Sequence, residues 1–284
     1  MKAAMIGVGA IGEPMAERVL EAGIDLAVYD VAPAQVAALA ARGARPAGSP
    51  SEAAQGAAVV GFVVRTDDQL LAATLGEHGA LESMTAGAVL AIQSTVLPET
   101  VEQIAAAATE RGVGVVDAPI TGGRPGAEAG TLVVMAGGSD TDLETCRPFL
   151  EAMSKQVVHC GPRGHGMIAK LCNNLVGYLA YFAAYEANQL ASRTGLDPAR
   201  LDEVLSSGGL MTGGMQGYLG LARTQQPEGN ESMQQMLERI TELAEKDLGH
   251  TLAAAEAVGL ELPASALCQK WMGRVYGLNE STDS

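Results

Sequence analysis

A glycine-rich segment near the amino terminus has the residue types and spacing of a pyrophosphate-binding loop. The motif GxGxxG occupies Gly7, Gly9, Ala10, Ile11 and Gly12, after an apolar run and at the start of a helical one. The first glycine permits a tight turn, the second lets a pyrophosphate approach the backbone, and the third lets the helix pack on the strand. The helix N-terminus adds free N–H groups and a partial positive charge. Because the chain has 35 glycines, the prediction depends on this strand-to-helix context rather than on the motif alone.

An acidic residue at the end of the next apolar run distinguishes between the two nicotinamide cofactors. Asp30 follows the motif at about the 20-residue spacing of the carboxylate that accepts the ribose hydroxyls of NAD. The same carboxylate would repel the 2′-phosphate of NADP, and Val31, Ala32 and Pro33 supply no cation to offset that repulsion. We therefore expect NAD, with NADP less favoured; a solvated aspartate in a turn is the alternative interpretation.

A lysine lies in an apolar stretch of the second half, four residues before an asparagine. Ala169 and Leu171 flank Lys170, which distinguishes it from a lysine on a solvated helix face. On a helix, Lys170 and Asn174 project from the same side. Partial burial favours the neutral form of a lysine, and a neutral lysine can accept a proton from a hydroxyl group. A polar contact inside a helix interface is the alternative interpretation of Asn174.

Alternating strand and helix patterns fill the chain up to about residue 160 and would position these residues. This order produces parallel strands joined by right-handed crossovers, so we predict an α/β Rossmann-type doubly wound parallel sheet. Strands are expected at 3–8, 26–29, 59–64, 88–92, 114–116, 132–136 and 156–159. Helices are expected at 13–21, 33–41, 98–110 and 140–152.

The pattern changes after the segment CGPRGHG at residues 160–166, whose Gly and Pro residues are typical of a hinge. Long helices are expected after it, at 167–193, 199–206, 232–258 and 264–276. We therefore predict an NAD-binding Rossmann domain at 1–163 and an all-helical substrate and dimerisation domain at 164–284. The uncharged stretch 171–185 must pack against apolar surfaces on more than one of its sides, so we expect a homodimer or homotetramer.

The composition excludes several classes of protein. A formal net charge of −15 argues against binding to nucleic acid and to anionic membranes. The four cysteines are widely spaced and form no metal-binding pattern, so we expect no metal and a reducing, cytoplasmic location. The amino terminus has no signal-peptide pattern, and the longest uncharged stretch is too short to span a bilayer.

Four segments together resemble, in order, the motifs of the β-hydroxyacid dehydrogenase family, which includes the 3-hydroxyisobutyrate dehydrogenases. They are GVGAIGEPMA at 7–16, DAPITGGRPGAEAGTL at 117–132, GHGMIAKLCNN at 164–174 and KDL at 246–248. The resemblance implies reversible oxidation of a small 3-hydroxy acid or reduction of its semialdehyde, with hydride exchanged with NAD or NADP. It also implies a Rossmann domain followed by an all-helical domain.

The resemblance also implies roles for individual residues. Lys170 is similar to the catalytic lysine of the family, which acts as general acid or base, and Asn174 is similar to the asparagine near it. The loop that holds the substrate carboxylate resembles Thr121, Gly122 and Gly123. A further set of positions resembles those that line the nicotinamide end of the cofactor: Val64, Arg65, Gln69, Thr95 and Lys246.

Three departures from the family pattern bear on the substrate. Thr121 replaces a usual serine and narrows the pocket by a methyl group, and Arg65 stands where proline is usual. The carboxyl terminus, GLNESTDS, lacks the glycine and aspartate pattern common in the family. The region 206–217 offers Met211 and Met215, which are flexible apolar side chains, so we expect a substrate with an apolar tail rather than a dicarboxylate.

Two other functions are compatible with this architecture. Imine reductases share it, but they generally carry an acid or an aromatic residue at the position of Lys170 and favour NADPH. A non-catalytic dinucleotide-binding protein is the second alternative, since some relatives have lost the lysine. Lys170 and Asp30 argue against the imine reductases, and the presence of Lys170, Asn174 and Lys246 argues against a non-catalytic role.

Overall fold

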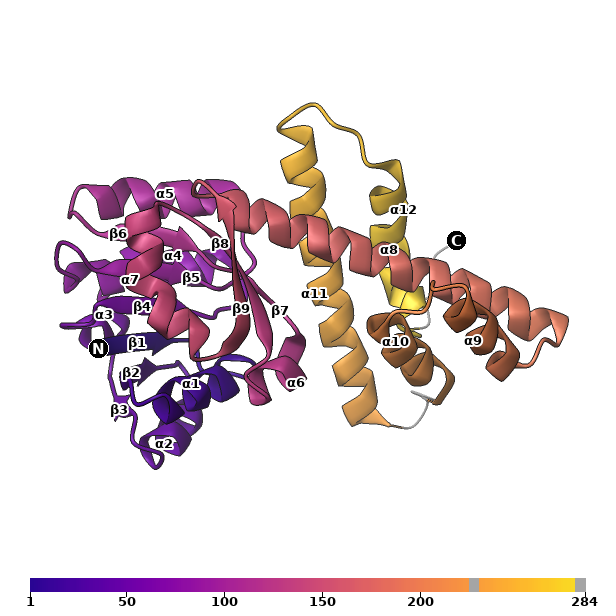
Figure 1. The fold of residues 1–284 in the computed structure, drawn as a ribbon, viewed down its shortest axis with the longest axis horizontal. Coiled ribbons are helices and arrows are strands. Elements are labelled where there is room, and N and C mark those ends of the chain that lie inside the picture. Colours follow the sequence, from indigo (N-terminus) through magenta and orange to yellow (C-terminus); the bar gives the residue numbers. More distant parts are fainter. Residues whose placement is uncertain (225–229, 279–284) are drawn as a thin grey trace. The chain divides into compact units, whose positions relative to one another are not determined.

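The amino-terminal part of the chain is built on one β-sheet. The structure is a computed structural model that describes residues 1–224 and 230–278. Within these residues nine strands form the sheet in the order β3-β2-β1-β4-β5-β6-β8-β7, with β9 paired to β8 (Figure 1). The strands are β1 (Lys2–Ile6), β2 (Asp25–Tyr29), β3 (Arg45–Pro46), β4 (Val59–Phe62), β5 (Val89–Ile92), β6 (Gly114–Asp117), β7 (Ile120–Thr121), β8 (Leu132–Gly137) and β9 (Ser154–Gly161).

Strands β1 to β6 pair in parallel, so the predicted doubly wound sheet is confirmed in this part of the molecule. The chain builds outward from β1 through β2 and β3 and then returns to place β4 on the other side of β1. Ligands of such sheets bind at the carboxyl ends of the strands at this switch point. Beyond β6 the sheet is mixed, because β8 runs antiparallel to β6 and β7 and only β9 is parallel to it. The short β7 and the short helix after it provide no full crossover between β6 and β8.

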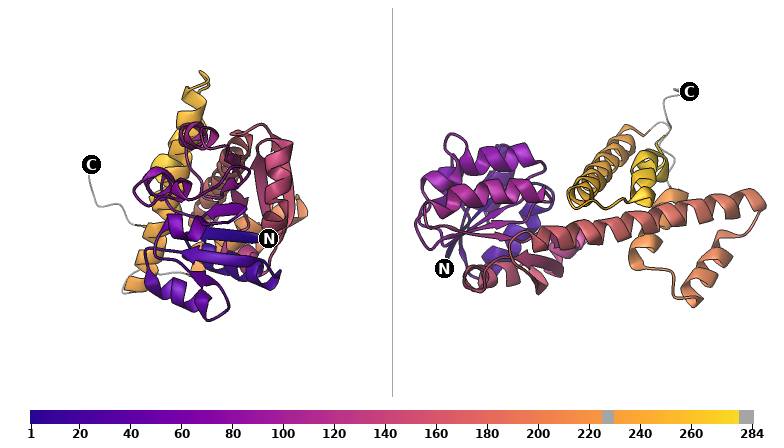
Figure 2. Two further views of the ribbon diagram at one scale, coloured as in Figure 1. Left: turned by 90° about the vertical axis from the view of Figure 1, so that its left-hand side faces the viewer. Right: turned by 90° about the horizontal axis from the view of Figure 1, so that it is seen from above.

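Helices cover both faces of this sheet (Figures 1 and 2). They are α1 (Gly12–Glu21), α2 (Pro33–Ala40), α3 (Pro50–Ala54), α4 (Asp67–Leu75), α5 (Pro98–Thr109), α6 (Gly123–Glu128) and α7 (Asp140–Glu151), with a 3₁₀ turn at Ala80–Glu82. Alternate residues of β1 supply the two cores: Ala3 and Met5 belong to one apolar cluster, and Ala4 and Ile6 to the other. Burial on both faces explains why these strands are continuous apolar runs in the sequence.

The chain divides into two compact units, Met1–Lys170 and Leu171–Ser284, here called unit 1 and unit 2. The predicted domain boundary, 163/164, lies slightly earlier than this division. The first turn of helix α8 (His165–Thr194) belongs to unit 1, because Met167 is fully buried in one of the two cores of the sheet.

Unit 2 is helical, as predicted. It contains the rest of α8 together with α9 (Pro198–Ser207), α10 (Gly213–Thr224), α11 (Glu231–Glu256) and α12 (Pro263–Val275). Its core includes stacked tyrosines, with the ring centroids of Tyr181 and Tyr218 separated by 5.5 Å. Arg223 of α10 donates to Asp202 of α9 and to Asn188 of α8, which holds these three helices together. No helix of the described residues is long and apolar enough to cross a membrane.

Candidate active site

The glycine-rich loop lies between the end of β1 and the start of α1. Gly7 adopts a φ of +88°, and a Cβ atom added to it would lie 2.3 Å from the carbonyl oxygen of Val63. A Cβ atom on Gly12 would lie 2.1 Å from the carbonyl oxygen of Gly7, whereas one on Gly9 would meet nothing within 4 Å. No described side chain caps α1 at Ile11, so no side-chain oxygen competes with an anion at the start of this helix. The loop is thus closely packed at its first and last glycines and open above the middle one, which fits a dinucleotide pyrophosphate.

Asp30 lies directly after β2 and faces the same loop. Its Oδ2 accepts a hydrogen bond from the backbone N–H of Val8 at 2.8 Å, and its Oδ1 accepts one from Ala32 at 2.8 Å. Each carboxylate oxygen therefore has one backbone donor and retains lone pairs for a further hydrogen bond. The two bonds fix the carboxylate against the glycine-rich loop, where the adenosine ribose of a dinucleotide would lie in a Rossmann domain.

A hydrogen bond joins the ends of β4 and β5, next to the residues predicted to line the nicotinamide. Ser94 is buried, and its Oγ accepts a hydrogen bond from the N–H of Val64 at 2.8 Å. Oε1 of Gln69 accepts a hydrogen bond from the N–H of Arg65 at 3.0 Å. Gln69 therefore shapes the turn that carries Val64 and Arg65, and Thr95 directly follows Ser94. Ser94 was not among the residues predicted from sequence.

The predicted substrate loop follows β7. Gly122 and Gly123 have φ values of +125° and +60°, a left-handed conformation that residues with a Cβ atom adopt at a cost. Nη1 of Arg124, the next residue, donates to the carbonyl oxygen of Ala10 at 2.9 Å. Arg124 thus connects the loop at Thr121 to the glycine-rich loop, although the two are far apart in sequence. The sequence offered no signal for this contact.

Lys170 is half-buried on α8, and Asn174 follows it by four residues on the same helix. Nδ2 of Asn174 donates to Oδ2 of Asp247 on α11 at 2.8 Å, and its Oδ1 accepts a hydrogen bond from Asn173 at 3.2 Å. The carboxylate therefore fixes which way the amide of Asn174 points.

Asp247 is the centre of a side-chain network in unit 2. It is only 3% exposed, and its Oδ2 also accepts a hydrogen bond from the hydroxyl of Tyr178 at 3.2 Å. The ammonium of Lys246 lies 3.1 Å from Oδ1. Burial, together with the negative charge of Asp247, raises the pKa of the Tyr178 phenol. The tyrosine therefore remains a hydrogen-bond donor to the carboxylate. Lys246 was predicted from sequence to lie at the site, whereas no role was predicted for Asp247 or Tyr178.

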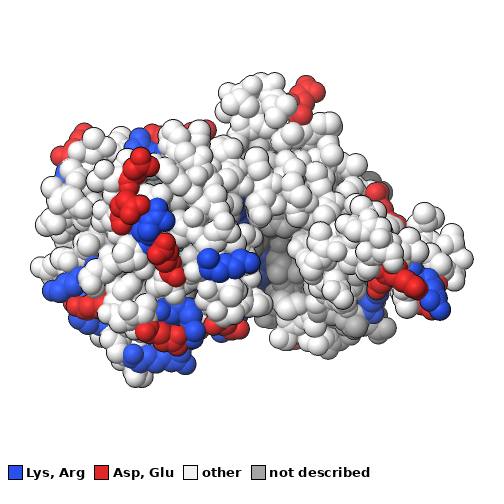
Figure 3. All heavy atoms as spheres, in the orientation of Figure 1, with Lys and Arg blue, Asp and Glu red and all other residues white. Residues whose placement is uncertain are grey.

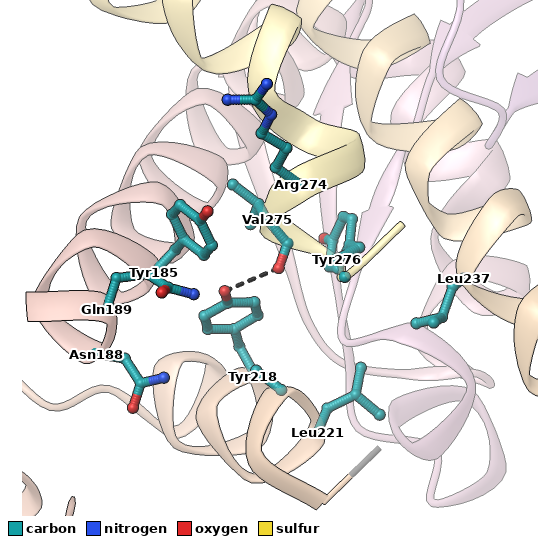
Figure 4. A pocket seen from close by; sticks show the side chains of 11 residues that line it. Tyr185, Asn188, Gln189, Tyr218, Leu221, Leu237, Arg274, Val275 and Tyr276 are labelled. Atoms are coloured by element: carbon teal, nitrogen blue, oxygen red, sulfur yellow. Dashed lines mark hydrogen bonds between the residues drawn. The ribbon is translucent and has the colours of Figure 1, made fainter. Parts of the chain in front are cut away.

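Unit 2 also contains a cavity of about 90 Å³, enough for a few water molecules. Its wall includes Tyr185, Gln189, Tyr218 and Arg274 (Figure 4), and it contains none of the residues predicted for the site. Met215, predicted to contact the substrate tail, is instead buried in the core of unit 2, while Met211 is half-buried beside that core. Among the described residues, no group of His, Cys, Asp and Glu side chains is arranged to hold a metal.

The chain is similar to known proteins over nearly all of its length. The family model described as the NAD binding domain of 6-phosphogluconate dehydrogenase matches residues 2–161. The model described as NAD-binding of NADP-dependent 3-hydroxyisobutyrate dehydrogenase matches residues 164–283. A 3-hydroxyisobutyrate dehydrogenase of Pseudomonas aeruginosa is 36% identical over 283 residues, which are 99% of this chain and 93% of that protein. The chain belongs to the β-hydroxyacid dehydrogenase family.

Other members of this family are also similar to the chain. An NAD-dependent L-serine dehydrogenase of Pseudomonas aeruginosa is 40% identical over 208 residues, covering 72% of this chain and 70% of that protein. The structure of Mycobacterium tuberculosis 3-hydroxyisobutyrate dehydrogenase with L-serine superposes with a TM-score of 0.82 at 28% identity, covering 96% of this chain and 92% of that one. The predicted family membership is therefore confirmed, and the chain carries the nicotinamide-dinucleotide-binding domains of an oxidoreductase family.

Proposed function

We propose that this protein oxidises a small 3-hydroxy acid with NAD, or reduces the matching semialdehyde, and that Lys170 is the general acid and base. The observation that carries the proposal is the arrangement on α8, where a half-buried lysine precedes an asparagine whose amide is oriented by the buried Asp247. A lysine on the solvated face of a purely structural helix would not need an oriented asparagine one turn away.

The residues of the chain divide the reaction between them. NAD, when bound, would supply the hydride acceptor for the carbon that bears the hydroxyl group. Thr121, Gly122 and Gly123 bind the substrate carboxylate, and Asn174 hydrogen-bonds the substrate. Neutral Lys170 takes the hydroxyl proton as the hydride leaves, so the products are the aldehyde, NADH and the ammonium form of the lysine. In the reverse direction Lys170 returns the proton to the carbonyl oxygen.

We infer that NAD is preferred over NADP. The carboxylate of Asp30 is held by Val8 and Ala32 and keeps lone pairs for the two ribose hydroxyls. A 2′-phosphate would meet this negative charge, and the segment 31–41 contains neither lysine nor arginine. Repulsion without a compensating cation favours the cofactor that lacks the phosphate.

We infer a substrate with a small apolar substituent. Met211 is the half-buried member of the predicted pair, and a methionine side chain adapts to an alkyl or aryl group. Arg65 is exposed at the turn after β4 and offers a cation either to the substrate or to the nicotinamide ribose.

The direct test follows nicotinamide absorbance with 3-hydroxyisobutyrate, L-serine, glycerate and a bulkier 3-hydroxy acid, each with NAD and with NADP. We expect NAD-dependent turnover that is greatest with an apolar-substituted acid. A more than tenfold advantage for glycerate would assign specificity to Arg65 instead. Turnover of imines but of no hydroxy acid would support an imine reductase, and cofactor binding without any turnover would support a non-catalytic role.

We also propose that unit 2 mediates self-association into a homodimer or homotetramer. Four apolar side chains of α8, α9 and the loop after α9 are 64–68% exposed: Val176, Leu190, Val204 and Leu210. On the face drawn in Figure 3, the charged side chains of unit 2 gather mainly near α9 and leave much of that surface uncharged. Exposed apolar area of this kind is typical of a protein interface. Sedimentation should show a dimer or larger species, and a monomer at micromolar concentration would contradict the proposal.

We place the protein in the cytoplasm, because Cys146, Cys160, Cys172 and Cys268 form no disulfide with one another. Unpaired thiols are typical of a reducing compartment. Localisation of a tagged full-length chain would test this placement.

A further inference from the structure

The proposed mechanism does not use Asp117, although this residue begins the segment that contains the substrate loop. Asp117 is the last residue of β6 and is fully buried. Its Oδ1 accepts a hydrogen bond from the N–H of Gly164 at 2.8 Å, and its Oδ2 accepts one from the N–H of Met167 at 2.6 Å. Both oxygens of a buried carboxylate are therefore bonded to the backbone at the start of α8. Lys170 lies three residues after Met167, within one turn of this contact.

The backbone around this contact is closely packed. A Cβ atom on Gly166 would lie 2.4 Å from the carbonyl oxygen of Met135 and 2.6 Å from that of Asp117. A Cβ atom on Gly137 would lie 2.6 Å from Oδ1 of Asp117. Real side chains do not tolerate such distances, so the two glycines allow the first turn of α8 to lie directly on β6 and β8. The carboxylate and the glycines together determine where the helix begins.

The electrostatic environment of Asp117 favours a carboxylate that accepts two hydrogen bonds. Burial raises the pKa of Asp117 to about 6, and the hydrogen bonds from Gly164 and Met167 oppose this rise. The partial positive charge at the N-terminus of an α-helix favours an anion in the same position. His165 lowers the pKa further, and Cys160 and Arg163 also interact electrostatically with this carboxylate. At neutral pH the ionised form predominates, and both of its oxygens accept.

We propose that Asp117 is a positioning residue for Lys170, because it fastens the first turn of α8 to the strand that leads into the substrate loop. One buried side chain then positions two groups that the proposed reaction uses: the loop at Thr121 to Gly123, and the lysine that exchanges the proton. The proposal rests on the proposed role of Lys170. It differs from a purely structural role because the effect on turnover depends on the lysine.

The test is a double-mutant cycle between Asp117→Asn and Lys170→Ala. Asparagine keeps the shape of the side chain but directs an NH₂ group at one of the two backbone N–H donors. We expect kcat to fall about 10²-fold, as small displacements of catalytic groups do, while the Kd for NADH changes less than twofold. In the Lys170→Ala background, Asp117→Asn should change the residual kcat less than twofold, because the positioned group is already absent.

Leu143→Ala is the matched control. Leu143 is buried in α7 of the same unit but belongs to the other core of the sheet than Met167, so this substitution should lower stability and leave the contact of Asp117 with α8 in place. We expect it to leave kcat within twofold of the wild-type value at a temperature where the protein remains folded. Where Asp117→Asn fails to fold, Gly166→Ala serves as the second variant, since its Cβ atom displaces the same turn, and the same cycle result is expected. Equal losses of kcat with and without Lys170 would overturn the proposal.

A second readout does not depend on activity. Amide hydrogen exchange should quicken at residues 164–170 in Asp117→Asn and stay unchanged there in Leu143→Ala, and unchanged exchange in Asp117→Asn would overturn the proposal. A wild-type protein that turns over no hydroxy acid would instead contradict the proposed function. The two failures are therefore distinguishable.

Discussion

The predicted site residues of unit 1 and those of unit 2 are held in position in different ways. In unit 1 the groups that would hold the dinucleotide are positioned mainly by the backbone: Gly7 and Gly12 pack against carbonyl groups, and Asp30 accepts two N–H bonds. In unit 2 the amide of Asn174 is oriented by the side chain of Asp247, 73 residues away in the sequence. Positioning by the local backbone gives contiguous sequence motifs, whereas positioning by distant side chains does not.

This difference leads to distinct expectations for mutations. Substitutions in the glycine-rich loop and at Asp30 should affect mainly which cofactor binds and how tightly, because these groups would face the dinucleotide. Substitutions in the network of unit 2 should affect turnover and leave the dinucleotide bound. Lys170 lies at the end of unit 1 and is expected to behave like the second class.

The largest expected effect is that of Lys170→Ala. Because proton transfer by a positioned group contributes about 10²–10⁴-fold, kcat should fall by this factor. Binding of NADH should change little, since the glycine-rich loop and Asp30 remain intact. Stopped-flow turnover and fluorescence titration with NADH measure the two quantities. A variant that keeps more than a tenth of wild-type kcat would contradict the assigned role.

Asp247→Asn should have the next largest effect. The amide of Asn174 and the hydroxyl of Tyr178 lose a charged acceptor, and such hydrogen bonds contribute about 1.5–3 kcal/mol. We expect kcat/KM for the hydroxy acid to fall about ten- to a hundredfold, with the Kd for NADH unchanged. Combining it with Asn174→Ala should add little to the loss caused by Asn174→Ala alone. Full additivity would show that Asp247 does not act through Asn174.

Asp30→Ala tests the backbone-positioned part of the site. The wild-type protein should favour NAD over NADP by at least about tenfold in kcat/KM, given the strength of hydrogen bonds to a carboxylate. The variant should lose most of this preference while its kcat with saturating NAD stays close to that of the wild type. Equal use of both cofactors by the wild-type protein would contradict the assignment of Asp30.

Arg124→Ala has the smallest expected effect and tests whether a long-range side-chain contact also positions groups in unit 1. Arg124 is a long-range side-chain contact within unit 1, but it is exposed and also pairs with Glu128. Because exposed polar contacts contribute little, we expect KM for NAD and for the hydroxy acid to rise about two- to fivefold. Arg147→Ala, which removes a half-buried arginine that also pairs with glutamates, is the control and should change neither. A loss above twentyfold would make side-chain positioning as important in unit 1 as in unit 2.

Much of the fold was predictable from sequence because its signals are local. The apolar runs of β1, β4 and β5 and the helices α8, α11 and α12 were expected close to their observed bounds. The short β3 and β7 were missed, since two residues carry no periodicity. Helix α10 was missed because its sequence, GGMQGYLGLART, is rich in glycine, and its position depends on contacts such as that of Arg223.

The candidate site was predictable from sequence only in part. The glycine-rich loop and Asp30 follow from spacing, and the structure places them together. Asp117 and Asp247 were quoted within motifs without a role, because nothing in a sequence shows that a carboxylate is buried against a particular helix. The sequence does place an acidic residue at the end of an otherwise apolar strand, Gly114–Asp117, and this is the signal from which Asp117 could have been found.

The most direct test of Lys170 as the acid and base is the pH dependence of kcat/KM for hydroxy-acid oxidation with NAD, compared between wild-type protein and Lys170→Ala. Neutral lysine is the base in this direction, so the wild-type rate should rise with pH as Lys170 loses its proton, and in the reduction direction it should fall. The residual rate of Lys170→Ala is expected to lack both of these limbs. The same limbs in the variant, at comparable rates, would place the acid and base on another residue and contradict the account.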